Sequence, residues 1–153
     1  MSDSCLIPVA PVELAPQRLR LKANLDGPCF ADAKSRLEQL EAAIDGGNWE
    51  SANSMARGFL AAVFVGICQT VEKGKEPREE SEARKRLADA GFFAPGRQAG
   101  KSPEAEFVWK MSAMMGTEGA HAGATAPDVA TYRYALALLT ADHFAERLAT
   151  TVS

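Results

Sequence analysis

The chain has 153 residues, of which 46% are hydrophobic and 24% charged, and its formal net charge is −3. This size and composition predict one soluble globular domain with a real core, placed in the cytoplasm because residues 1–16 lack the basic start and apolar stretch of a signal peptide. The acidic balance excludes a general attraction to nucleic acid or to an anionic membrane, so a nucleic-acid site has to be a local patch.

Residues 1–28 are predicted to form an N-terminal arm. Prolines at positions 8, 11 and 16 favour an extended start. Apolar residues at 19, 21, 23 and 25 then alternate with polar ones, which permits a short strand. An isolated strand has no partner here except a copy of itself. The arm is therefore expected to pack on the rest of the chain or on a second subunit.

Two long helices are predicted after the arm, over residues 29–45 and 48–73. Gly46 and Gly47 end the first, and Asn48 is a suitable N-cap for the second. The short connection predicts an antiparallel hairpin. The second helix is apolar nearly all round over residues 60–67, so it is expected to lie at the centre of the domain.

A charged helix is predicted over residues 78–90. Glu80 precedes Arg84 and Glu82 precedes Arg86 by four residues, the favourable order for ion pairs within a helix. The helix is expected to be a solvated outer one, with a partner surface as the alternative. Gly91 ends it, and the two phenylalanines that follow are expected to return to the core.

Two more helices complete the predicted domain, which spans residues 29–153. Ser102 caps the first of them and Pro103 begins it; the last runs from Pro127 to about Ala149. The side chains expected to point inward from the first are Phe107, Val108, Met111, Met114 and Met115. The apolar faces of the second are expected to carry Val129, Tyr132, Leu136, Leu139, His143, Phe144 and Leu148, with His143 as a core histidine. The whole pattern predicts an all-α antiparallel bundle of about five helices.

The connection over residues 116–126 is the part of the sequence that most strongly suggests a chemical role. Small residues surround Glu118 and His121 just before a helix N-terminus, where backbone N–H groups favour an anion. His121 is a candidate general acid or base, and Glu118 a candidate to orient it. The alternative is a glycine-rich connection whose histidine hydrogen-bonds the end of the preceding helix.

Arg57 and Arg133 are the basic residues expected inside the bundle or at its groove. Each is a candidate phosphate ligand, or a salt-bridge partner for a residue such as Glu106 or Asp142. No metal or cofactor is predicted, because neither histidine and none of the three cysteines stands in a metal-binding spacing, and no nucleotide-binding motif is present.

Two stretches resemble a known family. The run from Ala43 to Arg57, with its small loop followed by A-x-x-x-A-R, is similar to the opening of HEPN-type helical proteins, which include the C-terminal domains of abortive-infection proteins. The run from Gly116 to Pro127 and the helix after it resemble that family's His-Gly turn and closing helix. Together the two runs cover roughly residues 30–150.

The resemblance implies an antiparallel bundle, often a homodimer, from prokaryotic defence or toxin–antitoxin systems. Active members are metal-independent ribonucleases that use an arginine a few residues before a histidine, and the corresponding positions here are Met114, Met115 and Gly116. The expected function is thus a non-catalytic RNA-binding or protein-interaction module. The alternatives are a metal-independent ribonuclease that uses His121, with Arg57 or Arg133 in place of the missing arginine, and a structural dimerisation module.

Overall fold

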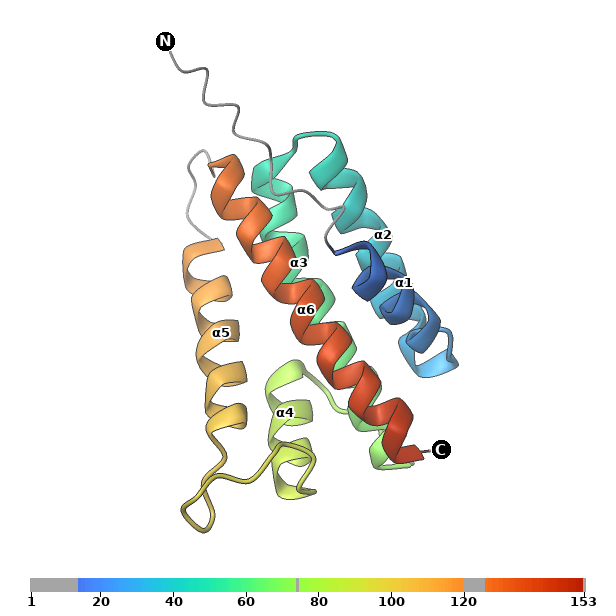
Figure 1. Ribbon diagram of the computed structural model, residues 1–153, viewed down its shortest axis with the longest axis vertical. Helices are drawn as coiled ribbons and strands as arrows, with labels where there is room; N and C mark the ends of the chain where they lie inside the picture. The colour runs from blue at the N-terminus through green and yellow to red at the C-terminus, as the bar shows by residue number, and fades with distance from the viewer. Residues whose placement is uncertain (1–13, 74, 120–125, 153) are drawn as a thin grey trace.

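The protein is an all-helical bundle in the residues that its structure, a computed structural model, describes: 14–73, 75–119 and 126–152 (Figure 1). The helices are α1 (Ala15–Asn24), α2 (Ala31–Asp45), α3 (Trp49–Val71), α4 (Glu80–Asp89), α5 (Pro103–Gly119) and α6 (Pro127–Val152), with a 3-10 turn, η1 (Pro28–Phe30), before α2. No strand occurs in these ranges, so the predicted all-α class is confirmed. The count of about five is one helix short, because α1 lies in the segment predicted as an arm.

Helix α3 is the centre of the bundle, as its sequence predicts. The side chain of Asn48 caps it by accepting a hydrogen bond from the Ser51 backbone N–H at 3.4 Å. Gly47, with a φ of 70°, turns the chain so that α2 and α3 form the predicted antiparallel hairpin. Helices α2, α4, α5 and α6 all pack against α3. It is also long and apolar enough for a membrane span, and half of its most apolar 18-residue window is buried inside the protein.

The stretch predicted as an arm contains a helix, so the possible strand over residues 18–25 is wrong. Leu21 and Leu25 are buried while Leu19 is 72% exposed, which is the four-residue spacing of a helix face rather than strand alternation. Arg20 Nε donates to Asp142 Oδ1 at 2.9 Å and so joins α1 to α6. The sequence could not show this, because a helix in which only Leu21 and the C-cap residue Leu25 are buried leaves the remaining positions free to alternate by chance. Residues 1–13 of the predicted arm lie outside the described residues.

The segment around α4 follows its prediction closely. The Arg84–Glu80 and Arg86–Glu82 pairs are present at 3.3 and 3.8 Å. Gly91 takes a φ of 73°, and the chain then returns Phe93 to the core with 4% of its surface exposed. The rings of Phe64, Phe93 and Phe144 form an aromatic cluster, with centroids 5.5–6.2 Å apart.

Several apolar side chains of α5 and α6 face outward, among them Phe107, which was predicted to point inward. Those that are exposed by 37–62% are Phe107, Val129, Tyr132 and Leu139. The sequence marks them as one wide apolar surface, but only the sector of each helix that meets its neighbours is buried. Val108, Met111, Met115, Phe144 and Leu148 do occupy the core, as predicted.

Candidate functional site

The predicted catalytic loop is shorter than its sequence suggests. Helix α5 continues to Gly119, so residues 116–119, predicted as loop, are helical. Glu118 therefore belongs to the last turn of α5, and its side chain lies outside the described part of the chain. His121 also lies outside it, in the connection between α5 and α6.

Arg133 is buried within the bundle, as predicted. It is 4% exposed, and its Nη1 donates to the amide oxygen of Asn53, on α3, at 2.6 Å. A buried guanidinium needs such partners because leaving water is costly for a charge. Arg133 also lines a hollow of about 280 Å³ with Met114, Asp128 and Tyr132. The hollow lies beside the ends of α5 and α6 that the connection with His121 joins.

Arg57 is exposed, so of its two predicted places the one inside the bundle is wrong. It follows Asn53 by one turn of α3, yet its side chain makes no ion pair or hydrogen bond with the described residues. Neither Glu106 nor Asp142, the acidic partners suggested for Arg57 and Arg133, pairs with either arginine. Asp142 binds Arg20, and Glu106 is exposed. The two predicted phosphate ligands therefore differ, one solvated and one buried.

A polar cluster that the sequence did not predict joins α5, α6 and the loop before α5. Arg147 Nη2 donates to Glu104 Oε2 at 3.0 Å, and Arg147 Nη1 donates to the other oxygen of that carboxylate and, at 3.2 Å, to the Phe92 carbonyl oxygen. The Ala94 backbone N–H donates to Glu104 Oε1 at 3.0 Å. These bonds, chiefly that from Arg147, hold the pKa of Glu104 below its ordinary value of 4.5.

His143 belongs to the rim of this cluster, so its predicted place in the core is wrong. Its side chain is 58% exposed, and its Nε2 lies 3.1 Å from Arg147 Nη2 and 3.7 Å from Glu104 Oε2. The imidazole therefore lies against both members of the Arg147–Glu104 pair. Both carboxylate oxygens accept hydrogen bonds from Arg147, so the cluster joins α5, α6 and the loop before α5.

The four-residue spacing of His143 and Arg147 on one helix would have predicted their contact. Glu104, 43 residues from Arg147, carries no such signal. Their pairing depends on how α5 packs beside α6, which no local pattern contains.

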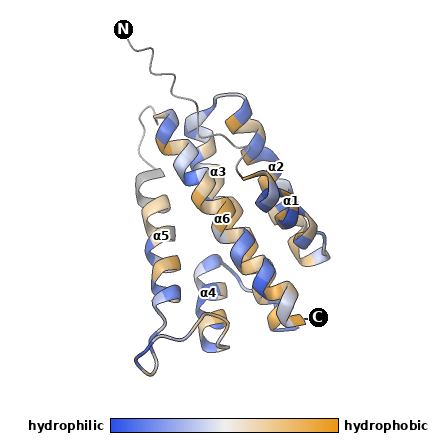
Figure 2. Cartoon of the chain, in the orientation of Figure 1, coloured by the Kyte–Doolittle hydropathy of each residue, from blue (hydrophilic) through white to orange (hydrophobic). Residues whose placement is uncertain are grey.

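The outward face of α6 carries a second unpredicted feature, a row of mainly apolar residues between Asp128 and His143 that we call the outer strip. Its members are Asp128, Tyr132, Ala135, Leu136, Leu139 and His143. These positions repeat every three to four residues and so share one face of the helix. Tyr132 is 62% exposed and Leu139 is 42% exposed. Helix α6 runs along the front of the bundle in the view of Figures 1 and 2, with no helix laid across it.

Comparison with known proteins adds no assignment: no protein-family model matches the chain, and no match was found among curated proteins or solved structures. Within the described ranges, no group of three or more His, Cys, Asp or Glu side chains is placed to hold a metal ion. The outer strip and the hollow beside Arg133 are thus the described features that bear on function.

Proposed function

We propose that the chain is a non-catalytic, HEPN-like interaction module of a prokaryotic defence system that pairs with a second copy of itself through the outer strip of α6. The resemblance of residues 43–57 and 116–127 supports the family and the setting. The exposed apolar row on α6 supports the interaction, and this row is the observation on which the proposal rests.

Single exposed apolar residues are normal on a protein surface, whereas a continuous row on one helix face marks a contact surface. Tyr132, Leu136 and Leu139 form such a row. The tyrosine at one end of this row is a typical anchor of protein interfaces, because the ring buries a large apolar area and its hydroxyl stays hydrated.

The row is also self-complementary, which favours a second copy over an unrelated partner. In the proposed dimer, two α6 helices pair antiparallel, with the symmetry axis between Ala135 and Leu136. Tyr132 then lies opposite Leu139 of the second copy, and Asp128 lies opposite its His143. The small side chain of Ala135 permits close approach at the crossing point. A two-fold interface requires such matching of one surface with itself.

Replacing Tyr132 by glutamate is expected to abolish self-association. The change places a charge against the Leu139 side chain of the other copy, twice in a symmetric dimer. The loss of an aromatic anchor costs about 2 kcal/mol or more each time. The dissociation constant should thus rise by about a thousandfold. Sedimentation velocity over a concentration series measures it, and a wild-type dimer beside a Tyr132→Glu monomer is the expected result.

The matched control is Leu19→Glu, because Leu19 is a 72% exposed leucine that belongs to α1 and not to the outer strip. This variant should dimerise like the wild type. A wild-type protein that stays monomeric at about 100 μM, where even weak complexes form, or an equal loss in both variants, would rule out the proposed interface.

A second candidate function is metal-independent RNA cleavage. The placement of Arg133 in the hollow beside the connection that carries His121 favours it, as does the solvated guanidinium of Arg57. His121 would act as the acid or base, Glu118 would orient it, and Arg57 or Arg133 would bind phosphate.

RNA cleavage in EDTA, lost on His121→Ala and retained in Lys110→Ala, is the expected result if this second function holds. The first change removes the proton-transfer group, and the second removes an exposed charge of α5 outside the proposed site. Gel analysis of a mixed RNA substrate measures both. Equal cleavage by the His121→Ala variant would point to a contaminant, and no cleavage by any of the proteins would remove the nuclease proposal. RNA binding without cleavage would appear as an affinity that falls steeply with salt.

A further inference from the structure

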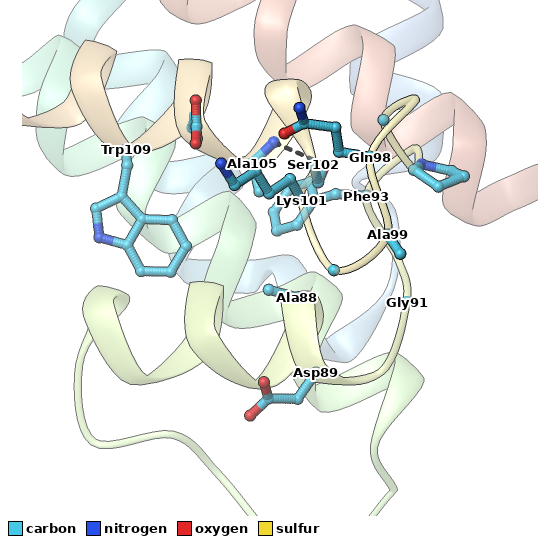
Figure 3. A pocket seen from close by; sticks show the side chains of 14 residues that line it. Ala88, Asp89, Gly91, Phe93, Gln98, Ala99, Lys101, Ser102, Ala105 and Trp109 are labelled. Carbon is cyan, nitrogen blue, oxygen red and sulfur yellow. Dashed lines mark hydrogen bonds between the residues drawn. The ribbon is translucent and has the colours of Figure 1, made fainter.

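We propose that the pocket between α4 and α5 is a binding site for a small organic cation of the methylated-ammonium class. The pocket has a volume of about 520 Å³ and is formed by the end of α4, the loop over residues 91–102 and the first turns of α5 (Figure 3). This volume is in the range of known small-molecule sites. The proposal is independent of self-association through α6.

The apolar wall of the pocket contains an exposed tryptophan. Trp109 is 39% exposed and lines the pocket together with Phe93 and Ala105, which are nearly fully buried. Figure 3 shows the indole at one side of the opening, with Lys101 beside it and Asp89 on the α4 side. Among aromatic side chains, the face of an indole ring attracts cations most strongly.

Buried polar groups hold Trp109 in place. The guanidinium of Arg84, itself only 7% exposed, lies 4.8 Å from the centre of the indole ring. Arg84 Nε lies 3.3 Å from Glu80 Oε1, and this carboxylate oxygen accepts a hydrogen bond from Ser112 Oγ at 2.9 Å. The network spans α4 and α5 and fixes the ring at the pocket wall before any ligand arrives. Such pre-ordering lowers the cost of binding.

Two carboxylates make the pocket acidic. Asp89 and Glu106 line it, and neither makes an ion pair or a side-chain hydrogen bond with the described residues. Lys101 is the one basic residue among the residues that line the pocket, which leaves a net lining charge of −1. Lys101 is exposed, so its long side chain can turn into solvent when a cation enters. Unpaired carboxylates beside an indole ring select a cation over a neutral molecule of equal shape.

The loop that forms the rim is closed by its own hydrogen bonds. The Gly96 N–H donates to the Lys101 carbonyl oxygen at 2.8 Å, and Ser102 Oγ donates to the Ala94 carbonyl oxygen at 2.6 Å. A side chain at Gly96 would come within 2.6 Å of the Pro103 ring, so the close approach requires glycine. The pocket is therefore already formed in the free protein.

Choline and 3,3-dimethylbutan-1-ol test the proposal, because the second has the same shape without the charge. The sequence has two tryptophans, so in a Trp49→Phe variant the emission comes from Trp109 alone. Titration with choline at constant ionic strength is expected to change this emission saturably, while the neutral alcohol leaves it unchanged.

Charge-neutral variants locate the binding. Asp89→Asn with Glu106→Gln, in the Trp49→Phe background, should weaken choline binding by about tenfold, since the ring alone retains part of the attraction. Glu38→Gln, an exposed acidic position on α2, is the matched control and should bind like the parent. Circular dichroism confirms that each variant is folded.

Three results would overturn the proposal. One is an equal response to choline and to the neutral alcohol, which would show a purely apolar pocket. Another is the absence of any saturable change in Trp109 emission at choline concentrations up to about 100 mM, which corresponds to the weakest affinity that still indicates a specific site. The third is choline affinity that the double variant leaves unaltered.

Discussion

Replacing Phe64 by alanine is expected to lower the free energy of unfolding by about 3–5 kcal/mol, the usual cost of removing a fully buried phenylalanine. Phe64 is 0% exposed on the central helix α3. Its ring contacts Phe93 and Phe144, at centroid distances of 6.2 and 5.5 Å. The substitution removes this three-way contact and leaves a cavity where α3, α6 and the loop after α4 meet. Urea denaturation followed by circular dichroism measures the change.

The matched control is Phe107→Ala, because Phe107 is the same residue type with 53% of its surface exposed on α5. Its loss should cost less than about 1 kcal/mol, since no closed cavity forms. Both variants are compared with the wild type at one fixed protein concentration, so that self-association does not alter the reference. A similar cost for the two phenylalanines would show that the aromatic cluster is not the packing centre of the bundle.

Replacing Gly66 by alanine is expected to destabilise the protein by about 1–3 kcal/mol, the cost of overfilling a packed core. The direction is informative, because glycine to alanine inside a helix normally stabilises by up to about 1 kcal/mol. At Gly66 an added Cβ would come within 2.5 Å of the Phe30 ring and 2.7 Å of the Cys29 carbonyl oxygen. Turn η1 therefore packs so closely on α3 that only glycine fits without a shift. Thermal and urea unfolding of the variant measure the effect.

Gly58→Ala on the same helix is the control with the opposite expected sign. There an added Cβ would meet only the end of the Arg36 side chain, with Nη1 at 2.9 Å. The Arg36 side chain is 48% exposed and can move aside, so the helix-favouring effect of alanine should dominate. A gain of about 0.5 kcal/mol is expected. If Gly66→Ala stabilised the protein as well, the close packing of η1 on α3 would be refuted.

The parts of the fold that were predicted correctly rest on contacts close in sequence. The Asn48 cap, the Gly47 turn and the four-residue ion pairs of α4 each involve residues within one or two turns of each other. Such features depend on backbone geometry and on side chains that the same short segment supplies. The length and apolarity of α3 likewise predict its central position without reference to its neighbours.

The candidate site was predicted less well, for a physical reason. Arg57 and Arg133 both lie on helices with wide apolar surfaces, and only the packing of α3 against α6 buries one and solvates the other. The sequence assigned His143 to the core by the same argument, and the packing of α5 beside α6 turned it to the rim of the Glu104–Arg147 pair. An ion pair between residues far apart in the sequence leaves no recognisable pattern in either segment.

The sequence by itself determined that this protein is all-helical, where most of its helices begin and end, and which of them is central, because caps, glycine turns and the 3.6-residue period act within a few residues. Only the tertiary structure decided which sector of each helix is buried. The packing of the helices against one another made α1 part of the bundle and left the outer strip of α6 exposed. It also placed Trp109 at the wall of an acidic pocket. The buried sector of a helix depends on where its neighbours lie, and those positions follow from the packing of the whole chain rather than from any one segment.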